Sequence, residues 1–379
     1  MNDSLILSIV IPTKNRYATL IPVLNYIFSS LKGANYEVVV HDNSDDNQII
    51  LDYISKMNEK RLKYFFSTDI LSQTENSNQA ILKSEGKYVC FIGDDDAVMP
   101  YILDVVKWMD SLKIDVLKGN KPQYFWPNQR YNYLSKSANG VLKIEAFNYQ
   151  VREISSVEAL NYTLKHGGVS MKKLPCVYHG VVSRKILNLI HQKTNTFFPG
   201  PSPDMANAIS LTMVIDKYYY LDLPIVISGK STHSIGGKGV LHKHISAISE
   251  VKHLPLGTNE KWTDRIPKYW TGPTIWAESV IKSLEALDKP ELIKKMNYQY
   301  LYAHLYVFNY QHRRKIFKNF QFNFSFSFYY YFIHIFVYRV RTFIKNRVGL
   351  VYRIMFNIKD LKSASKAILS YVDLNKTVF

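Results

Sequence analysis

The stretch from Lys87 to Pro100, KYVCFIGDDDAVMP, constrains the fold of this chain more than any other. Its apolar run, Tyr88–Ile92, is typical of a buried strand, and a glycine and three consecutive aspartates, Asp94–Asp96, follow it. Neighbouring carboxylates repel one another, and burying them without a partner costs several kcal/mol. The stretch therefore predicts either a polar turn or a site where a cation, such as Mg²⁺ or Mn²⁺ carrying a phosphate, meets the carboxylates.

The first third of the chain alternates strand and helix patterns. We expect strands at Leu5–Ile11, Tyr36–His41, Leu62–Phe66 and Tyr88–Ile92, and helices at Leu20–Leu31, Gln48–Met57, Thr74–Lys83 and Pro100–Leu112. This order predicts a parallel sheet with right-handed crossovers, in which ligands bind at the carboxyl ends of the strands. Polar clusters stand at three of those ends: Pro12–Arg16, Asp42–Asp45 and Asp94–Asp96.

Three sequence blocks of this region resemble family 2 glycosyltransferases of the GT-A fold. They read SIVIPTKNRYATL, EVVVHDNSDD and NSNQAILKSEGKYVCFIGDDD, and they lie within about the first 110 residues. The resemblance implies a nucleotide-sugar donor and a divalent metal, Mn²⁺ or Mg²⁺. Neither GxGxxG nor GxxxxGK[ST] occurs, which argues against a Rossmann dinucleotide site and a P-loop.

The resemblance also implies a set of nucleotide-binding residues: Pro12, Thr13 and Arg16 border the nucleotide, Asp42 contacts the base, and Asn78 lies on the helix that closes the pocket. Each of these residues has a structural alternative. Asp42 can form a turn after its strand, Arg16 can cap a helix, and Asn78 can be a surface amide.

For the aspartates, the resemblance implies that Asp94 faces the ribose or supports the site, while Asp95 and Asp96 face the metal. Gly93 stands where the commonest family sequence has an acid. Which of the three aspartates touches the metal therefore stays open. His233 is the candidate to complete the metal shell, with a solvated loop histidine as the alternative.

The segment FFPGPSPDMANAISL, which begins at Phe197, leads into a predicted helix at Met205–Val214. By the resemblance, Asp204 at the start of this helix is the catalytic base. Inverting transfer needs one carboxylate to take the proton of the acceptor hydroxyl. The alternative is a helix-capping aspartate, whose anion the helix dipole stabilises.

Between these blocks the pattern is less regular. We expect a hairpin or insertion at Lys121–Ala146, a helix at Ser156–Lys165, and strands at Cys176–Ser183 and Pro224–Ser228. The loop after the last strand is rich in glycine and serine and carries Lys230, His233 and Lys238. Glycines permit closure, and lysines hold phosphate oxygens, so this loop is a candidate lid over the diphosphate.

The net charge of +17 is distributed unevenly along the chain. Residues 1–119 hold 12 Lys and Arg against 16 Asp and Glu, whereas residues 297–379 hold 13 against 2. A basic tail after a near-neutral first domain predicts a polyanionic partner, either nucleic acid or anionic lipid. The hydrophobic content of 47% excludes global disorder.

The tail contains an uncharged stretch, residues 319–338, which is long enough for a membrane span but too rich in Asn, Gln and Ser to be a good one. Its first half, Phe320–Phe328, alternates with period two and suits a strand. Apolar residues then recur at helical spacing from Phe336 to Met355, with basic residues between them. This predicts an amphipathic helix on an anionic membrane surface, with packing on its own domain as the alternative. Basic residues interleaved with large aliphatics disfavour nucleic acid.

The sequence therefore predicts an α/β protein of GT-A fold, with a mostly parallel sheet flanked by helices and a C-terminal helical, basic and aromatic extension that associates with membranes. We expect the nucleotide-sugar-binding half at residues 1–118, the acceptor-side half at 119–245 and the extension at 246–379.

The predicted function is inverting transfer of a sugar from a nucleotide-diphosphate donor, first of all a UDP-sugar, to a lipid-linked or polymeric surface glycan such as capsule, O-antigen or teichoic acid. The alternatives are a non-catalytic GT-A-like partner of a membrane glycan-assembly complex and a sugar-phosphate nucleotidyltransferase. Two distant cysteines, Cys90 and Cys176, fit a reducing compartment, so we expect a cytoplasmic protein on the inner face of the membrane. The sugar, the linkage and the oligomeric state, a homo-oligomer included, stay open.

Overall fold

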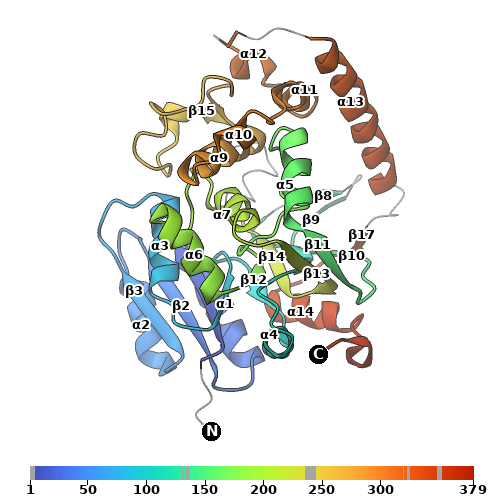
Figure 1. Ribbon diagram of the computed structural model, residues 1–379. Helices are drawn as coiled ribbons and strands as arrows, with labels where there is room; N and C mark the ends of the chain where they lie inside the picture. Colours follow the sequence, from blue (N-terminus) through green and yellow to red (C-terminus); the bar gives the residue numbers. More distant parts are fainter. Residues whose placement is uncertain are drawn as a thin grey trace.

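The computed structural model describes residues 5–129, 131–133, 136–234, 245–318, 320–321, 325–347 and 352–379 (Figure 1). The strands of its main sheet are β1 (Leu7–Thr13), β2 (Tyr36–Asp42), β3 (Leu62–Phe66), β4 (Tyr88–Phe91), β6 (Val116–Asn120), β11 (Val151–Ser155), β12 (Gly180–Ser183) and β13 (Lys217–Pro224). They lie in the order β11-β13-β6-β12-β4-β1-β2-β3. Strands β4, β1, β2 and β3 pair in parallel, as do β6 and β13, while β11 and β12 run antiparallel to their neighbours. The predicted α/β class with a mostly parallel sheet is confirmed.

A second sheet is smaller than the main sheet. Its strands are β5 (Ala97–Val98), β7 (Gln123–Phe125), β10 (Val141–Glu145), β14 (Val226–Lys230) and β17 (Tyr352–Met355), in the order β17-β10-β7-β14-β5. Two small antiparallel pairs complete the strands: β8 (Tyr131–Tyr133) with β9 (Lys136–Ala138), and β15 (Ser246–Ala247) with β16 (Tyr269–Trp270). The antiparallel pairing of β7 with β10 confirms the hairpin expected between residues 121 and 146.

The helices cover the main sheet and build the C-terminal region above it (Figure 1). They are α1 (Tyr17–Ser30), α2 (Gln48–Met57), α3 (Gln73–Leu82), α4 (Ile102–Ser111), α5 (Ser156–Lys165), α6 (Arg184–Thr194), α7 (Pro203–Thr212), α9 (Gly272–Ala286), α10 (Pro290–Ile293), α11 (Tyr298–Phe308), α12 (Arg313–Ile316), α13 (Phe326–Arg347) and α14 (Leu361–Leu369), with short 3₁₀ turns η1 (Ile248–Glu250) and η2 (Leu374–Lys376).

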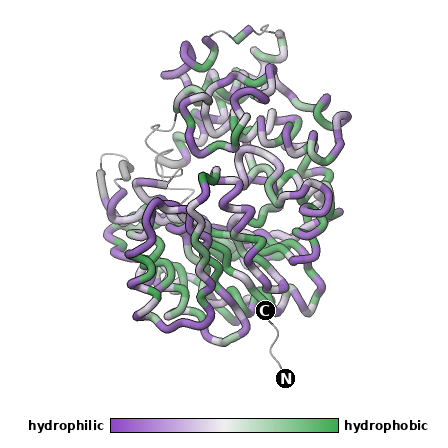
Figure 2. Tube along the Cα trace, turned by 90° about the vertical axis from the view of Figure 1, so that its left-hand side faces the viewer, coloured by the Kyte–Doolittle hydropathy of each residue, from purple (hydrophilic) through white to green (hydrophobic). Residues whose placement is uncertain are grey.

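The central strands of the main sheet are buried on both faces, and alternate strand residues belong to two different cores. Val10 and Val39 lie in one core, together with residues of α3, α6, α7 and α9. Ile9 and Val40 lie in the other, together with residues of α1, α4 and α14. Strands buried on both faces are rich in apolar residues, which explains the hydrophobic runs of β1, β2 and β4. Figure 2 shows hydrophobic residues gathered in the lower half of the molecule, where Figure 1 places the main sheet.

The predicted strand at Cys176–Ser183 forms only over its second half. Residues 176–179 make a tight turn in which His179 has a positive φ of 64°. Gly180 follows, and a Cβ there would lie 2.1 Å from the carbonyl oxygen of Cys176, so only glycine fits. The turn directs the His179 ring toward the end of β4, as described below.

Two predictions for the tail are also wrong in part. Phe326–Phe328 begin helix α13 and do not continue a strand, and Tyr352–Met355 leave the predicted helix to pair with β10. Residues 322–324 and 348–351, over which the two patterns were also predicted, lie outside the described part of the chain. The basic and aromatic helix itself is confirmed as α13.

The end of the chain returns to the N-terminal half. Helix α14 packs on α1, where the Tyr26 hydroxyl donates to Ser365 Oγ (2.8 Å), and Leu361 and Ile368 join the core below the sheet. The division into residues 1–118, 119–245 and 246–379 stays a prediction, but α14 packs on the first unit and β17 pairs with β10 of the second. In the described part of the chain, no helix combines the length and the apolarity that crossing a bilayer requires.

Candidate active site

The predicted polar clusters meet at one edge of the main sheet. The parallel register places Thr13 at the end of β1 opposite Asp42 at the end of β2. The Thr13 hydroxyl also donates to Asp94 Oδ2 (2.7 Å), which ties the end of β1 to the residues after β4. Strand β14 of the second sheet reaches the same place, because the Gly229 N–H donates to Asp96 Oδ1 (2.7 Å).

Arg16 is the cation that faces the first two aspartates. Its Nη1 lies 2.6 Å from Asp94 Oδ1, and its Nη2 lies 3.1 Å from Asp95 Oδ2. Ser231 joins them: its hydroxyl accepts from Arg16 Nη2 (2.7 Å), and its N–H and hydroxyl lie 2.9 and 2.7 Å from Asp95 Oδ2. Burial raises the pKa of Asp94 to about 7, against the opposing charge of Arg16.

Asp96 has a different environment, in which its oxygens accept from four donors. Oδ1 accepts from Gly229, and Oδ2 accepts from the Gly93 N–H (2.7 Å), the Tyr178 hydroxyl (3.0 Å) and His179 Nε2 (2.6 Å). Burial opposes ionisation, but His179 and these hydrogen bonds hold the pKa of Asp96 well below its usual range. Asp96 thereby ties three segments together.

This packing gives a reason for glycine at position 93. A Cβ on Gly93 would lie 3.0 Å from Asp96 Oδ2 and 3.4 Å from both Asp95 Oδ1 and the Tyr178 hydroxyl. An acid at this position would press its side chain against the carboxylate of Asp96. The departure from the commonest family sequence is therefore coupled to the inward orientation of Asp96.

Two lysines stand near the same carboxylates. Lys121 Nζ lies 3.1 Å from His179 Nδ1, and burial lowers the pKa of His179, so we infer a neutral ring that donates from Nε2 to Asp96 and accepts on Nδ1. Burial also lowers the pKa of Lys230, against the opposing carboxylate charge of Asp96. Lys230 is half-buried and belongs to the candidate lid segment. The following loop, residues 235–244 with Lys238, lies outside the described residues.

Asp204 lies in the first turn of α7, directly after Pro203, and its side chain is half-buried. Its Oδ1 accepts from the Ser202 hydroxyl and from the Met205 N–H (2.8 Å). Its charge also contributes, after burial and the Asp96 carboxylate, to the raised pKa of Tyr178. The structure thus brings Asp204 close to the aspartate cluster, at a helix N-terminus that stabilises its anion.

Asp42 is fully buried at the end of β2. Its Oδ2 accepts from the hydroxyls of Tyr17 (2.6 Å) and Tyr64 (2.8 Å), and its Oδ1 accepts from the N–H (2.9 Å) and hydroxyl (2.5 Å) of Ser44. Burial, followed by the Asp42 carboxylate, raises the pKa of Tyr17 to about 12. The turn that was the structural alternative for Asp42 is present, and its contact with a base stays a prediction.

Helix α3 presents two asparagines to different neighbours. Ser72 and Glu75 form a capping box at its start. Asn76 then lies toward the site: its Oδ1 is 2.6 Å from His41 Nδ1, and its Nδ2 donates to the Thr13 carbonyl (3.0 Å). Asn78 instead accepts from the loop before α7, through Thr196 Oγ1 (3.0 Å) and the Phe197 N–H (2.8 Å). Asn78 fixes this loop, and its predicted place in the nucleotide pocket stays untested. Pro12 lies in β1, opposite His41 of β2.

The residues predicted to hold a metal differ in what they offer. Both oxygens of Asp96 already accept hydrogen bonds, and His233 is exposed and has no hydrogen bond or ion pair within the described residues. By contrast, Asp94 Oδ1 is buried without a hydrogen bond, and no hydrogen bond of the described residues uses Asp95 Oδ1.

These two oxygens, one of them in an ion pair with Arg16, decide how a metal fits. Nowhere in the described ranges do three His, Cys, Asp or Glu side chains stand ready to hold an ion by themselves. Magnesium is commonly held by one or two carboxylates together with substrate phosphates. Asp94 and Asp95 fit that arrangement, and the metal contacts predicted for Asp96 and His233 stay untested.

The strand ends that carry the polar clusters lie in a part of the chain that matches a known protein family. Residues 8–170 match a sequence model described as glycosyl transferase family 2, and the match contains β1, β2 and β4 with Asp94–Asp96. The chain carries a family 2 glycosyltransferase domain. The three sequence blocks that suggested the family all lie within the matched residues, so the predicted resemblance is confirmed.

Several structures of S. aureus TarS are similar to this chain in outline. A TarS crystal structure has a TM-score of 0.43 at 16% identity, covering 82% of this chain and 53% of that chain. TarS 1–349 in complex with UDP-GlcNAc has a TM-score of 0.45 at 14% identity, covering 94% of this chain and 98% of that chain. This chain thus spans about half of the longer TarS chain. No curated protein sequence matches it significantly.

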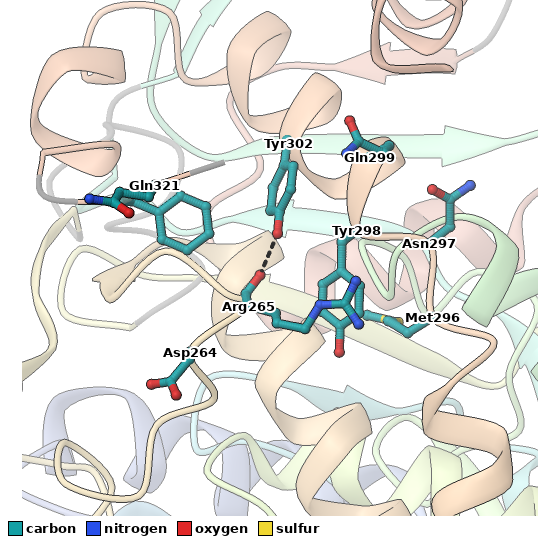
Figure 3. A pocket seen from close by; sticks show the side chains of 9 residues that line it. Asp264, Arg265, Met296, Asn297, Tyr298, Gln299, Tyr302 and Gln321 are labelled. Carbon is teal, nitrogen blue, oxygen red and sulfur yellow. Dashed lines mark hydrogen bonds between the residues drawn. The ribbon is translucent and has the colours of Figure 1, made fainter. Parts of the chain in front are cut away.

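Outside the matched residues, the C-terminal region lines an open pocket of about 390 Å³ (Figure 3). Arg265 lies flat over the ring of Tyr298, 4.1 Å from its centroid, and the Tyr302 hydroxyl donates to the Arg265 carbonyl (2.8 Å). Phe320 packs edge-on against Tyr302. Aromatic faces beside amide and charged groups suit a small hydroxyl-rich ligand such as a sugar.

The functional candidates that sequence reasoning missed are partners of the aspartates. Tyr178 and His179 follow a strand pattern in the sequence, and only the turn before Gly180 directs them at Asp96. Ser231 comes from the Gly/Ser-rich loop, whose composition signals mobility and carries no sign of a contact with Asp95. Only Tyr17, the partner of Asp42, could have been suspected from the sequence, because it directly follows Arg16 in the first sequence block.

Proposed function

We propose that the family 2 domain transfers a sugar from a nucleoside-diphosphate donor, a UDP-sugar first of all, to a surface glycan acceptor with inversion at the anomeric carbon. The observation that carries the proposal is the pairing of Arg16 with Asp94 and Asp95 at the carboxyl edge of the sheet, with Lys230 of β14 beside them and Asp204 of α7 near enough to act on Lys230 electrostatically. A donor site needs cationic groups for the diphosphate and a carboxylate for the acceptor. Both kinds of group lie here within one polar cluster.

In this proposal Asp204 is the general base. As the acceptor oxygen forms its bond to the anomeric carbon, its proton passes to the Asp204 carboxylate, and the bond to the diphosphate oxygen breaks. The Ser202 hydroxyl and the Met205 N–H orient Asp204, and both leave its Oδ2 free to accept. The helix N-terminus favours the anion that a base must be before it acts.

Arg16 and Lys230 supply positive charge for the diphosphate. A divalent metal, Mn²⁺ or Mg²⁺, would be held by Asp94 and Asp95 together with the phosphates, and it would stabilise the leaving group as a Lewis acid. Asp96 would act as a positioning residue, because its four donors come from Gly93, the 178–179 turn and β14.

The test is calorimetry followed by kinetics. Titration with UDP in the presence of Mn²⁺ should show binding, and the absence of metal-dependent nucleotide binding would contradict the enzyme function. Hydrolysis of a panel of nucleotide sugars then identifies the donor. Asp204→Asn should lower turnover by about 10²–10⁴-fold and leave UDP affinity within a few-fold. Turnover that survives in Asp204→Asn would make Asp204 a structural residue of the helix start.

The C-terminal region supports our proposal for the acceptor and its location. Helix α13 packs Phe328 and Ile335 inward, while its exposed large apolar residues are Phe326, Tyr329, Tyr330, Ile333, Phe336, Val337, Tyr338, Val340, Phe343 and Ile344. Arg341 and Lys345 are exposed beside them, and the helix contains no acid. This combination of apolar and basic groups supports binding to an anionic membrane surface and hence a lipid-linked acceptor on its cytoplasmic side.

A further inference from the structure

Arg16 lies between the aspartate cluster and the solvent. It extends from the loop after β1, at the N-terminal boundary of α1, and its side chain is 21% exposed, whereas those of Asp94 and Asp95 are 3% and 5% exposed. The only cationic side chain with a short ion pair to Asp94 or Asp95, among the described residues, is this arginine. Arg16 therefore compensates a charge that the protein could not otherwise bury.

The carboxylate oxygens that Arg16 covers are the ones that suit a metal. Asp94 Oδ1 lies 2.6 Å from Arg16 Nη1 and has no hydrogen bond. Asp95 Oδ2 is held by Ser231 as well as by Arg16, which leaves Asp95 Oδ1 as its open oxygen. A divalent cation bound to this pair would stand within a few ångströms of the guanidinium, and two positive charges repel strongly at that distance.

The guanidinium is not locked in place from the other side. Among the described residues, its one hydrogen bond outside the carboxylates goes to Ser231 Oγ (2.7 Å), a loop hydroxyl. A guanidinium is also the group best suited to bind phosphate oxygens in a two-pronged manner. A diphosphate that enters this edge offers Arg16 a partner equal to the carboxylate it leaves.

We propose that Arg16 and the donor's divalent cation occupy the Asp94–Asp95 pair in alternation, so that Arg16 closes the pair in the donor-free protein and turns to the diphosphate when nucleotide and metal bind together. This proposal rests on the function proposed above and names the residue that couples its two ligands. Metal alone then binds weakly, because it must displace Arg16 from the carboxylates while no diphosphate is present to bind the displaced guanidinium. Nucleotide strengthens metal binding, and by linkage metal strengthens nucleotide binding by the same factor.

The test compares two binding experiments that Arg16→Gln should change in opposite directions. Calorimetric titration with Mn²⁺ alone should show affinity at least about tenfold higher in Arg16→Gln than in the wild type, because the competing cation is gone. Titration with UDP at saturating Mn²⁺ should show affinity at least about tenfold lower, because the phosphate loses its arginine. Arg61→Gln is the matched control, since Arg61 pairs with Glu59 away from the site, and it should change neither value.

A purely structural Arg16 gives a different result. In that case Arg16→Gln would bind Mn²⁺ no better than the wild type, and the proposal would be overturned. If Arg16→Gln does not fold, Ser231→Ala serves instead, because it removes the hydroxyl shared by Arg16 and Asp95 while keeping the backbone donor. It should raise affinity for Mn²⁺ alone about threefold, and unchanged or weaker affinity would overturn the proposal. Failure of the wild type to bind UDP with Mn²⁺ contradicts the proposed function, whereas the titrations with metal alone still decide whether Arg16 competes.

Discussion

The two ends of this molecule handle charged and apolar groups in opposite ways. At the carboxyl edge of the main sheet, three acids are buried and each is matched by named donors or cations. In helix α13, large aromatic and aliphatic side chains are exposed beside basic residues. Buried charge requires a fixed set of partners, whereas exposed apolar area requires a partner from outside the chain. The sheet edge is therefore built around internal contacts, and helix α13 is built around an external surface.

The largest expected effect tests how fixed the buried acids are. Asp96→Asn should lower the free energy of unfolding by about 3–5 kcal/mol, because its amide would face donors that need an acceptor. Asp360→Asn is the control in the C-terminal region, where Asp360 caps α14 through the Ser363 N–H, and should cost about 1 kcal/mol or less. Urea denaturation followed by circular dichroism measures both. Equal costs would show that the four donors of Asp96 add no rigidity.

The second prediction concerns the pH dependence of stability, at a buried histidine of the C-terminal region. Burial on α11 lowers the pKa of His304 from 6.5 to about 4, and its Nδ1 has no hydrogen bond. The unfolded chain therefore binds a proton at His304 more readily than the folded protein does. The folded state keeps its full free energy of unfolding above pH 6.5, and it loses part of it as the pH falls toward 4. The full loss is about 3 kcal/mol.

The measurement is denaturation of the wild type and His304→Leu at pH 7, 6 and 5. The difference in stability between wild type and variant should shift in favour of the variant as the pH falls. A difference that does not change with pH would show that His304 stays solvated.

The third prediction concerns the exposed face of α13. Ser in place of Phe336 and Phe343 together should weaken binding to vesicles of anionic phosphatidylglycerol about tenfold, because both rings are more than half exposed, 51% and 57%. Unfolding by urea should not change. Point substitutions are preferable to truncation, because β17 and α14 follow this helix and pack on the N-terminal half.

Vesicles of neutral phosphatidylcholine are the control for charge. They should bind the wild type weakly, because Arg341 and Lys345 then lack anionic partners. Undiminished binding of the double variant to anionic vesicles would place the membrane contact elsewhere or exclude it.

Sequence periodicity predicted the first half of the fold well, because β1, β2 and β4 are buried strands and each helix between them packs an apolar stripe on the sheet. It failed where tertiary contacts decide. Tyr352–Met355 continue a helical apolar spacing, yet an open edge at β10 turns them into a strand. Cys176–His179 follow a strand pattern, yet the turn before Gly180 interrupts the strand and leaves only Tyr178 bridged to Phe91 of β4.

The sequence by itself determined that Asp94, Asp95 and Asp96 stand at the end of a buried strand, near Thr13 and Asp42, because parallel strands end at one edge. The partner that each aspartate meets depends on the tertiary structure. Arg16 reaches Asp94 and Asp95 across the sheet edge, and His179 reaches Asp96 from a turn 83 residues later in the chain. Such long-range contacts depend on backbone direction at Gly93 and Gly180, which residue spacing does not reveal. The position of the three aspartates could therefore be predicted from the sequence, whereas their partners could not.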